Sequence, residues 1–140
     1  MPSDAALDSA EVTAALTRML NAGPLDHWPK RRGDVDVLAA LASARFEPRH
    51  TYREDEVNAL LEAWLEPFTV AGAVDHVSLR RLLVDQRLLL RNPAGTAYRL
   101  NAALVATLIS ADAQAIDPGD VLAALQTKRE SRKRERAGKS

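Results

Sequence analysis

The sequence predicts a mainly α-helical fold with one small β-hairpin. Apolar residues recur at the three- and four-residue spacing of amphipathic helices along most of the 140 residues, and one short segment follows a strand-turn-strand pattern instead. The chain is 46% hydrophobic and 27% charged, so it has enough apolar residues to bury the core of one domain. It contains no cysteine, which excludes disulfides, thiolate metal sites and cysteine nucleophiles.

Two helices are expected in the N-terminal third, joined by a basic connector. Ser9 is the candidate N-cap of the first helix, which Gly23-Pro24 ends, and the second helix begins near Asp34. The connector contains the run Lys30-Arg31-Arg32. Cations are unfavourable beside a helix N-terminus because the helix dipole is positive there, so this run is either a phosphate contact or a solvated loop.

Two further helices are expected in the middle of the chain. Residues 50–52 favour a short strand, and three acids at 54–56 then open a helix that Pro67 stops. After a loop, Asp75 caps a helix that runs to about Gln86. Its spacing places Leu79, Leu82 and Leu83 on the buried face, Arg80 at the border, and Ser78, Arg81 and Asp85 outside.

The C-terminal part combines the hairpin with two more helices. Residues 88–91 and 96–100 read as strands around a turn in which Gly95 suits a positive φ. Asn101 caps an apolar helix, and Asp117-Pro118 starts a last helix that runs into a basic tail.

From residue 34 to residue 100 the expected order is helix, short strand, helix, loop, helix, hairpin. This is the order of a winged helix-turn-helix, in which the third helix is the one presented to the major groove. The chain therefore divides into an N-terminal helical extension at 1–24, a winged-helix-like domain at 25–100, C-terminal helices at 101–127 that pack on the core or on a dimer partner, and a basic tail at 128–140, expected to be disordered or a frayed helix.

Charge is unevenly distributed along a chain whose net charge is zero. Residues 128–140 hold seven basic and two acidic side chains, against 12 basic and 17 acidic in the rest. Residues 80–99 contain five arginines and one acid, whereas residues 54–66 contain five acids and no base. Arginine can bind phosphate or guanine through two parallel hydrogen bonds, so the candidate nucleic-acid contacts are Ser78, Arg80, Arg81, Arg91, Arg99, Lys128, Arg129, Arg132, Lys133 and Arg134.

Each of these candidates also has a purely structural interpretation. Arg81 is spaced to pair with Asp85 one helical turn later, and Arg80 can lay its aliphatic stem over the edge of the core. Arg91 and Arg99 can pair across the strands or simply keep the surface soluble. The tail can be a solvated terminus.

The sequence favours no enzyme, no metal site and no cofactor. It has no glycine-rich phosphate loop, no cluster of metal ligands and no nucleophile motif. His27, His50 and His76 do not have the spacing of a metal site. The N-terminus lacks the pattern of a secretory signal and no apolar run reaches about 18 residues, so a cytoplasmic protein without a membrane partner is expected.

Several segments between Leu25 and Leu100 carry a family resemblance. They are Trp28-Pro29-Lys30, Phe46-Glu47-Pro48-Arg49, Tyr52-Arg53-Glu54-Asp55-Glu56-Val57-Asn58, Asp75-His76-Val77-Ser78-Leu79-Arg80-Arg81, Leu83-Val84-Asp85 and Leu90-Arg91 with Gly95 and Tyr98. In this order they resemble an uncharacterised bacterial domain family, domain of unknown function 2087. The resemblance implies a winged-helix-like domain, found alone or fused to ArsR-type regulators, and a role in transcription; it implies no ligand and no catalytic residue. The link before Asp75 is longer than the family usually has.

Two functions therefore stand side by side. The first is a DNA-binding transcriptional regulator that contacts double-stranded DNA, with RNA as the alternative nucleic acid and with the terminal helices available for a homodimer on a palindromic site. The second is a protein-protein interaction module on the same scaffold, in which the acidic helix at 54–66, with Trp64, meets a basic partner. The three acids at 54–56 argue against a close approach of phosphate.

Overall fold

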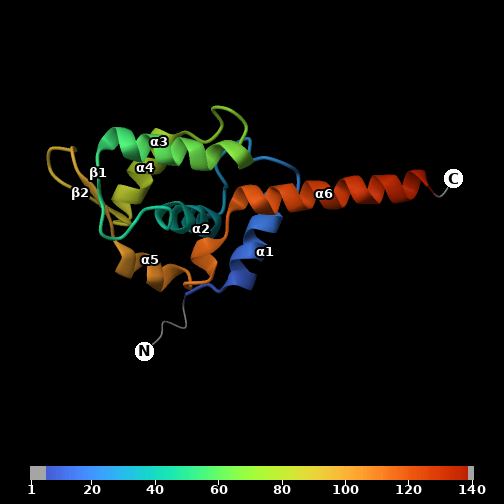
Figure 1. Ribbon diagram of the computed structural model, residues 1–140, viewed down its shortest axis with the longest axis horizontal. Helices are drawn as coiled ribbons and strands as arrows, with labels where there is room; N and C mark the ends of the chain where they lie inside the picture. Colours follow the sequence, from blue (N-terminus) through green and yellow to red (C-terminus); the bar gives the residue numbers. More distant parts are fainter. Residues whose placement is uncertain (1–5, 139–140) are drawn as a thin grey trace.

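The computed structural model describes residues 6–138, so the predicted ends of the N-terminal extension (1–5) and of the basic tail (139–140) lie outside it. Within that range the chain forms a mainly helical body with a three-stranded antiparallel sheet at one end and a long helix that leaves the other end (Figure 1). This confirms the predicted fold class. None of the described helices is both long and apolar enough to cross a membrane.

The elements follow the predicted order. The helices are α1 (Ser9–Met19), α2 (Arg32–Ser43), α3 (Glu54–Leu65), α4 (His76–Asp85), α5 (Ala102–Leu108) and α6 (Pro118–Ala137). The strands are β1 (Thr51–Tyr52), β2 (Leu89–Arg91) and β3 (Tyr98–Leu100), and two short 3₁₀ turns are η1 (Glu66–Phe68) and η2 (Ala113–Ala115). The run α2-β1-α3-α4-β2-β3 is compatible with a winged-helix-like fold.

The sheet has the strand order β1-β3-β2. The predicted hairpin β2-β3 is formed, and the β-favouring segment before α3 becomes the third strand by pairing with β3, with Thr51 opposite Arg99 and Tyr52 opposite Tyr98. The edge of the Phe46 ring packs on Tyr52, with ring centroids 5.0 Å apart. This pairing holds the start of α3 next to the hairpin.

Local capping explains where most of the helices begin. Asp75, Asn101 and Asp117 cap α4, α5 and α6 as predicted. The prediction for α1 was one residue off, since the cap is Asp8, which accepts the Glu11 N–H while the Glu11 carboxylate accepts from Asp8 N–H. This reciprocal arrangement satisfies two backbone N–H groups at the start of the helix.

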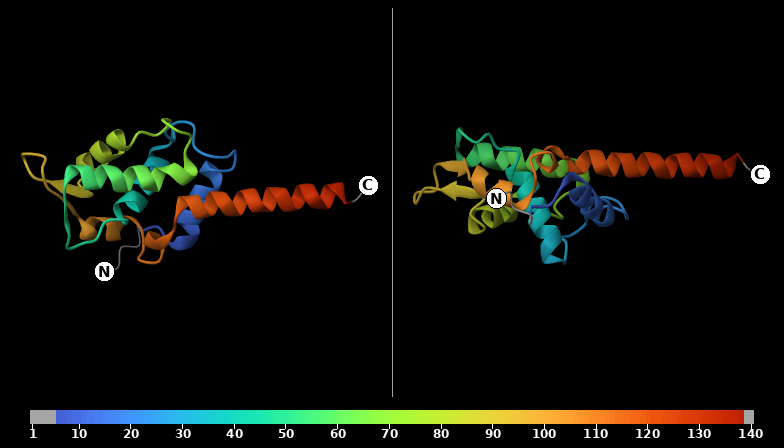
Figure 2. Two further views of the ribbon diagram at one scale, coloured as in Figure 1. Left: turned by 45° about the horizontal axis from the view of Figure 1, so that its top comes forward. Right: turned by 90° about the horizontal axis from the view of Figure 1, so that it is seen from below.

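The terminal helices pack on the body of their own chain. Val12 and Leu16 of α1 and Leu122 of α6 are buried in the same core as Leu61 and Leu83 of the winged-helix-like region. α1 contacts α2 and α6, and α6 contacts η1. The apolar faces of α1 and α6, which the sequence left available for a dimer, thus pack on the same chain. Beyond the body, α6 is exposed from residue 126 onward and continues as a helix to Ala137 (Figure 2).

An ion pair fastens α1 to α2. Arg18 donates two hydrogen bonds to the Asp34 carboxylate, at 2.8 and 2.6 Å. Asp34 is one of the few polar side chains in the buried part of the described chain. The hydrogen bonds from Arg18 hold the pKa of Asp34 below its usual value, against the opposing effect of burial.

Candidate nucleic-acid interface

A hollow of about 300 Å³ lies between α4 and the hairpin, and we refer to it as the α4–hairpin groove. α3, α4, β2 and β3 all contribute to it, with Glu54, Arg80, Arg81, Val84, Asp85, Arg91 and Tyr98 as its lining. In a winged helix this is where the recognition helix meets the wing. The groove therefore brings together three of the predicted contact residues.

The first turn of α4 is fixed by its cap. Asp75 accepts hydrogen bonds from the N–H groups of Val77 and Ser78, and the Ser78 hydroxyl donates to the same carboxylate at 2.9 Å. The bond from the Ser78 hydroxyl is the main reason that the pKa of Asp75 lies below its usual value. Ser78 is exposed at the start of α4, but its hydroxyl proton is committed to the cap.

Arg80 is not available as a free phosphate contact. Its side chain is only 13% exposed, and its Nη2 lies 3.0 Å from the Glu54 carboxylate of α3. Its Nη1 donates to the Asn58 side-chain carbonyl. The structural interpretation of Arg80 as a residue at the edge of the core is therefore the one that the structure supports.

The acidic residues at the start of α3 are paired with arginines and are not free negative charges. Glu54 is paired with Arg80, and Asp55 lies 3.0 Å from Arg53. The hydrogen bond from Arg53 lowers the pKa of Asp55. Glu56 lies 3.8 Å from the same Arg53, so each of the three carboxylates expected to repel phosphate has an arginine beside it.

Arg81 and Arg91 are the two exposed cations of the groove. No ion pair among residues 6–138 involves either of them, so the predicted Arg81–Asp85 pair is not formed. The Arg91 guanidinium lies against Gly95, where a Cβ would collide with it. Gly95 has a φ of +72°, which is why the turn needs glycine, and a side chain there would also displace the Arg91 guanidinium.

Arg99 points away from this groove. Leu90 pairs with Arg99, and Arg91 pairs with Tyr98. Because successive side chains alternate between the faces of a sheet, Arg91 and Arg99 lie on opposite faces. Burial agrees, since Tyr98 is buried while Arg99 and Leu90 are exposed. Arg99 is therefore a predicted contact that lies outside the groove, on the opposite face of the sheet from Arg91.

The five predicted contacts of the tail lie far from the groove. Lys128, Arg129, Arg132, Lys133 and Arg134 are exposed along the part of α6 that leaves the body at the end opposite the hairpin (Figure 1). In the described part of the tail the backbone is helical rather than disordered. The candidate residues thus form two separate cationic surfaces and one isolated arginine on the outer face of the sheet.

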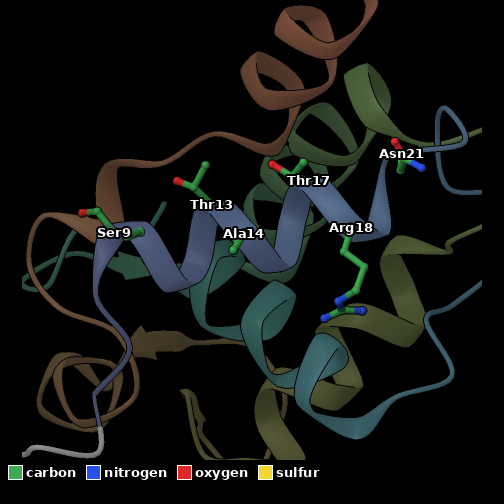
Figure 3. Close-up of a pocket in the computed structure, with 7 residues that line it drawn as sticks. Ser9, Thr13, Ala14, Thr17, Arg18 and Asn21 are labelled. Atoms are coloured by element: carbon green, nitrogen blue, oxygen red, sulfur yellow. The ribbon is translucent and has the colours of Figure 1, made fainter.

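Other features offer less chemistry. A hollow along α1 is lined mainly by small side chains, among them Thr13, Ala14 and Thr17, and its one charged residue, Arg18, extends toward α2 (Figure 3). The run at 30–32 is exposed, with Arg32 inside α2 and Arg31 as an N-cap that makes no side-chain bond. Among residues 6–138, no group of three or more His, Asp and Glu side chains is placed to hold a metal ion.

Comparison with known proteins gives one match. A family model described as "Uncharacterized protein conserved in bacteria (DUF2087)" matches residues 24–100. No curated protein and no solved structure matches the chain. The matched region contains the whole α4–hairpin groove, while α1 and α6 lie outside it.

Proposed function

The chain belongs to the bacterial family DUF2087, and we propose that it binds double-stranded DNA as a transcriptional regulator, with α4 and the hairpin as its main contact surface. The order α2-β1-α3-α4-β2-β3 supports this, because in a winged helix-turn-helix the helix before the hairpin enters the major groove. The family match, residues 24–100, covers this unit.

One observation carries the proposal: Arg81 and Arg91 come from different elements, line one groove and take part in no ion pair among residues 6–138. Arg81 is on the outward face of α4, where it can reach base edges or the backbone, and Arg91 is on the hairpin, where it can reach a flanking phosphate. With Arg80 neutralised by Glu54, these two guanidinium groups carry the binding at this surface.

The test compares a charge reversal in the groove with one outside it. We expect Arg81→Glu with Arg91→Glu to weaken duplex binding, measured by fluorescence anisotropy with a labelled duplex, while Arg49→Glu, in an exposed loop after α2, keeps the wild-type affinity. Wild-type affinity should fall with salt, with log K decreasing by about 0.9 per neutralised phosphate for each unit of log salt concentration. Unchanged affinity in the double variant would refute the assignment.

Arg80 is left intact in this experiment on purpose. Its replacement by glutamate would put a second carboxylate beside Glu54 at a largely buried position, so a loss of binding could reflect loss of the fold. The contact surface is tested cleanly only through the exposed pair.

The second candidate is a protein-interaction module that uses the outward face of α3. Glu62 and Glu66 are exposed there and take part in no ion pair among residues 6–138, which favours a basic partner. Trp64 does not belong to that surface, because it is 8% exposed and its ring meets Phe68 edge to face. Absence of binding to duplex DNA, single-stranded DNA and RNA alike at low salt would favour this candidate over the first.

A further inference from the structure

The basic segment of α6 is a regular cationic surface and not merely a charged terminus. The part of α6 that packs on the body uses Pro118, Val121, Leu122 and Leu125. The same helical spacing continues beyond the body through Lys128, Arg129, Arg132, Lys133 and Arg136, which we call the α6 stripe. Arg134 lies off the stripe, one turn after Glu130.

The charges of the α6 stripe are not compensated within the described chain. None of its five residues takes part in an ion pair among residues 6–138. Lys128 with Arg132, Arg129 with Lys133, and Arg132 with Arg136 are like charges one helical turn apart, and such pairs destabilise a helix. A polyanion on this side would relieve that repulsion and release its own counterions.

The α6 stripe and the α4–hairpin groove are held at opposite ends of the body. Glu54, at the N-terminal end of α3, lines the groove, whereas Pro67, just beyond its C-terminal end, meets Gly119 of α6. The 12 residues of α3 separate the two points by about 18 Å, and the α6 stripe starts about 14 Å farther along α6. All views show α6 leaving the body away from the hairpin (Figure 2).

The surface that joins the two ends along α3 is acidic. Glu62 and Glu66 are exposed between the groove and the start of α6. A stiff duplex lying along α3 would bring its phosphates onto these carboxylates, which is unfavourable. One short duplex therefore cannot satisfy both cationic surfaces along this route.

We propose that the protein bridges two nucleic-acid duplex segments, with one on the α4–hairpin groove and the other on the α6 stripe. This rests on the proposed function, since the groove must bind a duplex. A second copy of the chain, docked through its acidic α3 onto the α6 stripe, is the competing occupant. Isolated surface carboxylates attract cations less strongly than the dense charge of a duplex, so the duplex is favoured.

The experiment uses the full chain and two short duplexes of unrelated sequence. One duplex carries biotin and is immobilised on beads, and the other carries fluorescein. At low salt the wild-type protein is expected to retain the fluorescent duplex on the beads. The groove variant Arg81→Glu with Arg91→Glu and the stripe variant Lys128→Glu with Arg132→Glu remove the same amount of charge, so each controls for the other. Each should lose most of the capture while still binding one duplex in solution.

The outcomes separate this proposal from the one on which it rests. If the wild-type protein binds a single duplex but captures no second one, bridging is wrong and the proposed function stands. If it binds no duplex, both are wrong. If the stripe variant still captures the second duplex, the α6 stripe is not the second binding surface and the proposal is overturned. It is also overturned if light scattering at the same salt shows a DNA-free dimer of the wild-type protein that the stripe variant does not form, because the α6 stripe then binds a second copy of the chain.

Discussion

The α4–hairpin groove and the α6 stripe are both cationic, but the chain holds their charges in opposite ways. In the groove, each arginine is placed by a framework: a capped helix, a three-stranded sheet and a glycine turn that accommodates Arg91. In the α6 stripe, the charges sit on the part of α6 whose residues, from 126 to 138, are all exposed. Fixed positions are suited to reading a shape or a base edge, whereas unconstrained charge is suited to sequence-independent attraction.

The largest effect on stability is expected at Tyr98. It is 2% exposed and belongs to the central strand, in register with both β1 and β2. Replacing it with alanine should cost about 3–5 kcal/mol of unfolding free energy, because an aromatic group in the core leaves a cavity. Urea unfolding measures this, with Tyr98→Phe as the control that keeps the ring. If the alanine variant lost little unfolding free energy, packing of Tyr98 would not be what holds the strands beneath the groove in place.

A smaller effect is expected at Gly95, where stability and binding are linked. Alanine at a φ of +72° should cost about 1–2 kcal/mol, and its Cβ would displace the Arg91 guanidinium. Gly33→Ala is the matched control, since Gly33 has open space and no positive φ. Gly95→Ala should weaken duplex binding and Gly33→Ala should not. Equal binding in both variants would show that Arg91 needs no fixed position.

The Arg18–Asp34 pair predicts a pH dependence of stability in the framework that holds α1 against α2. Because the pKa of Asp34 is lower in the folded state than its usual 3.8, its contribution is present above that value and is lost as the pH falls through the folded-state pKa. Thermal unfolding between pH 6 and about pH 3 should therefore show a drop that is smaller in Asp34→Asn. An identical drop in both proteins would mean that this pair does not anchor α1.

The smallest effect is expected from proline in the free part of α6. Ser131→Pro should break the helix beyond the body and lower the helical signal in circular dichroism. The free energy of unfolding in urea should change by no more than the roughly 0.5 kcal/mol typical of surface changes, so the midpoint should hardly move. A lower midpoint would show that this segment packs on the body.

Local features were the part of the structure that the sequence predicted well. The caps at Asp75, Asn101 and Asp117 and the order of the elements follow from residue types a few positions apart. One error was also local and avoidable, since Asp8 with Glu11 is a capping pattern. The alternation of strand side chains likewise separates Arg91 from Arg99 without knowledge of the fold.

What could not be predicted depends on contacts between distant segments. The pairing of Arg80 with Glu54 and Asn58 joins two helices across a loop, and no spacing rule relates them. The same holds for β1 against β3 and for Arg18 with Asp34. These contacts decide which arginines are exposed, so they decide the composition of the candidate site.

The most direct test of the account is to map where a duplex touches the protein. Amide chemical-shift changes of the isotopically labelled protein, recorded while a short duplex is added at low salt, should cluster in α4, in residues 89–98 and in the α6 stripe, with the exposed face of α3 around Glu62 unaffected. Changes confined to α3, or spread evenly over the surface, would contradict the assignment of the α4–hairpin groove as the nucleic-acid interface.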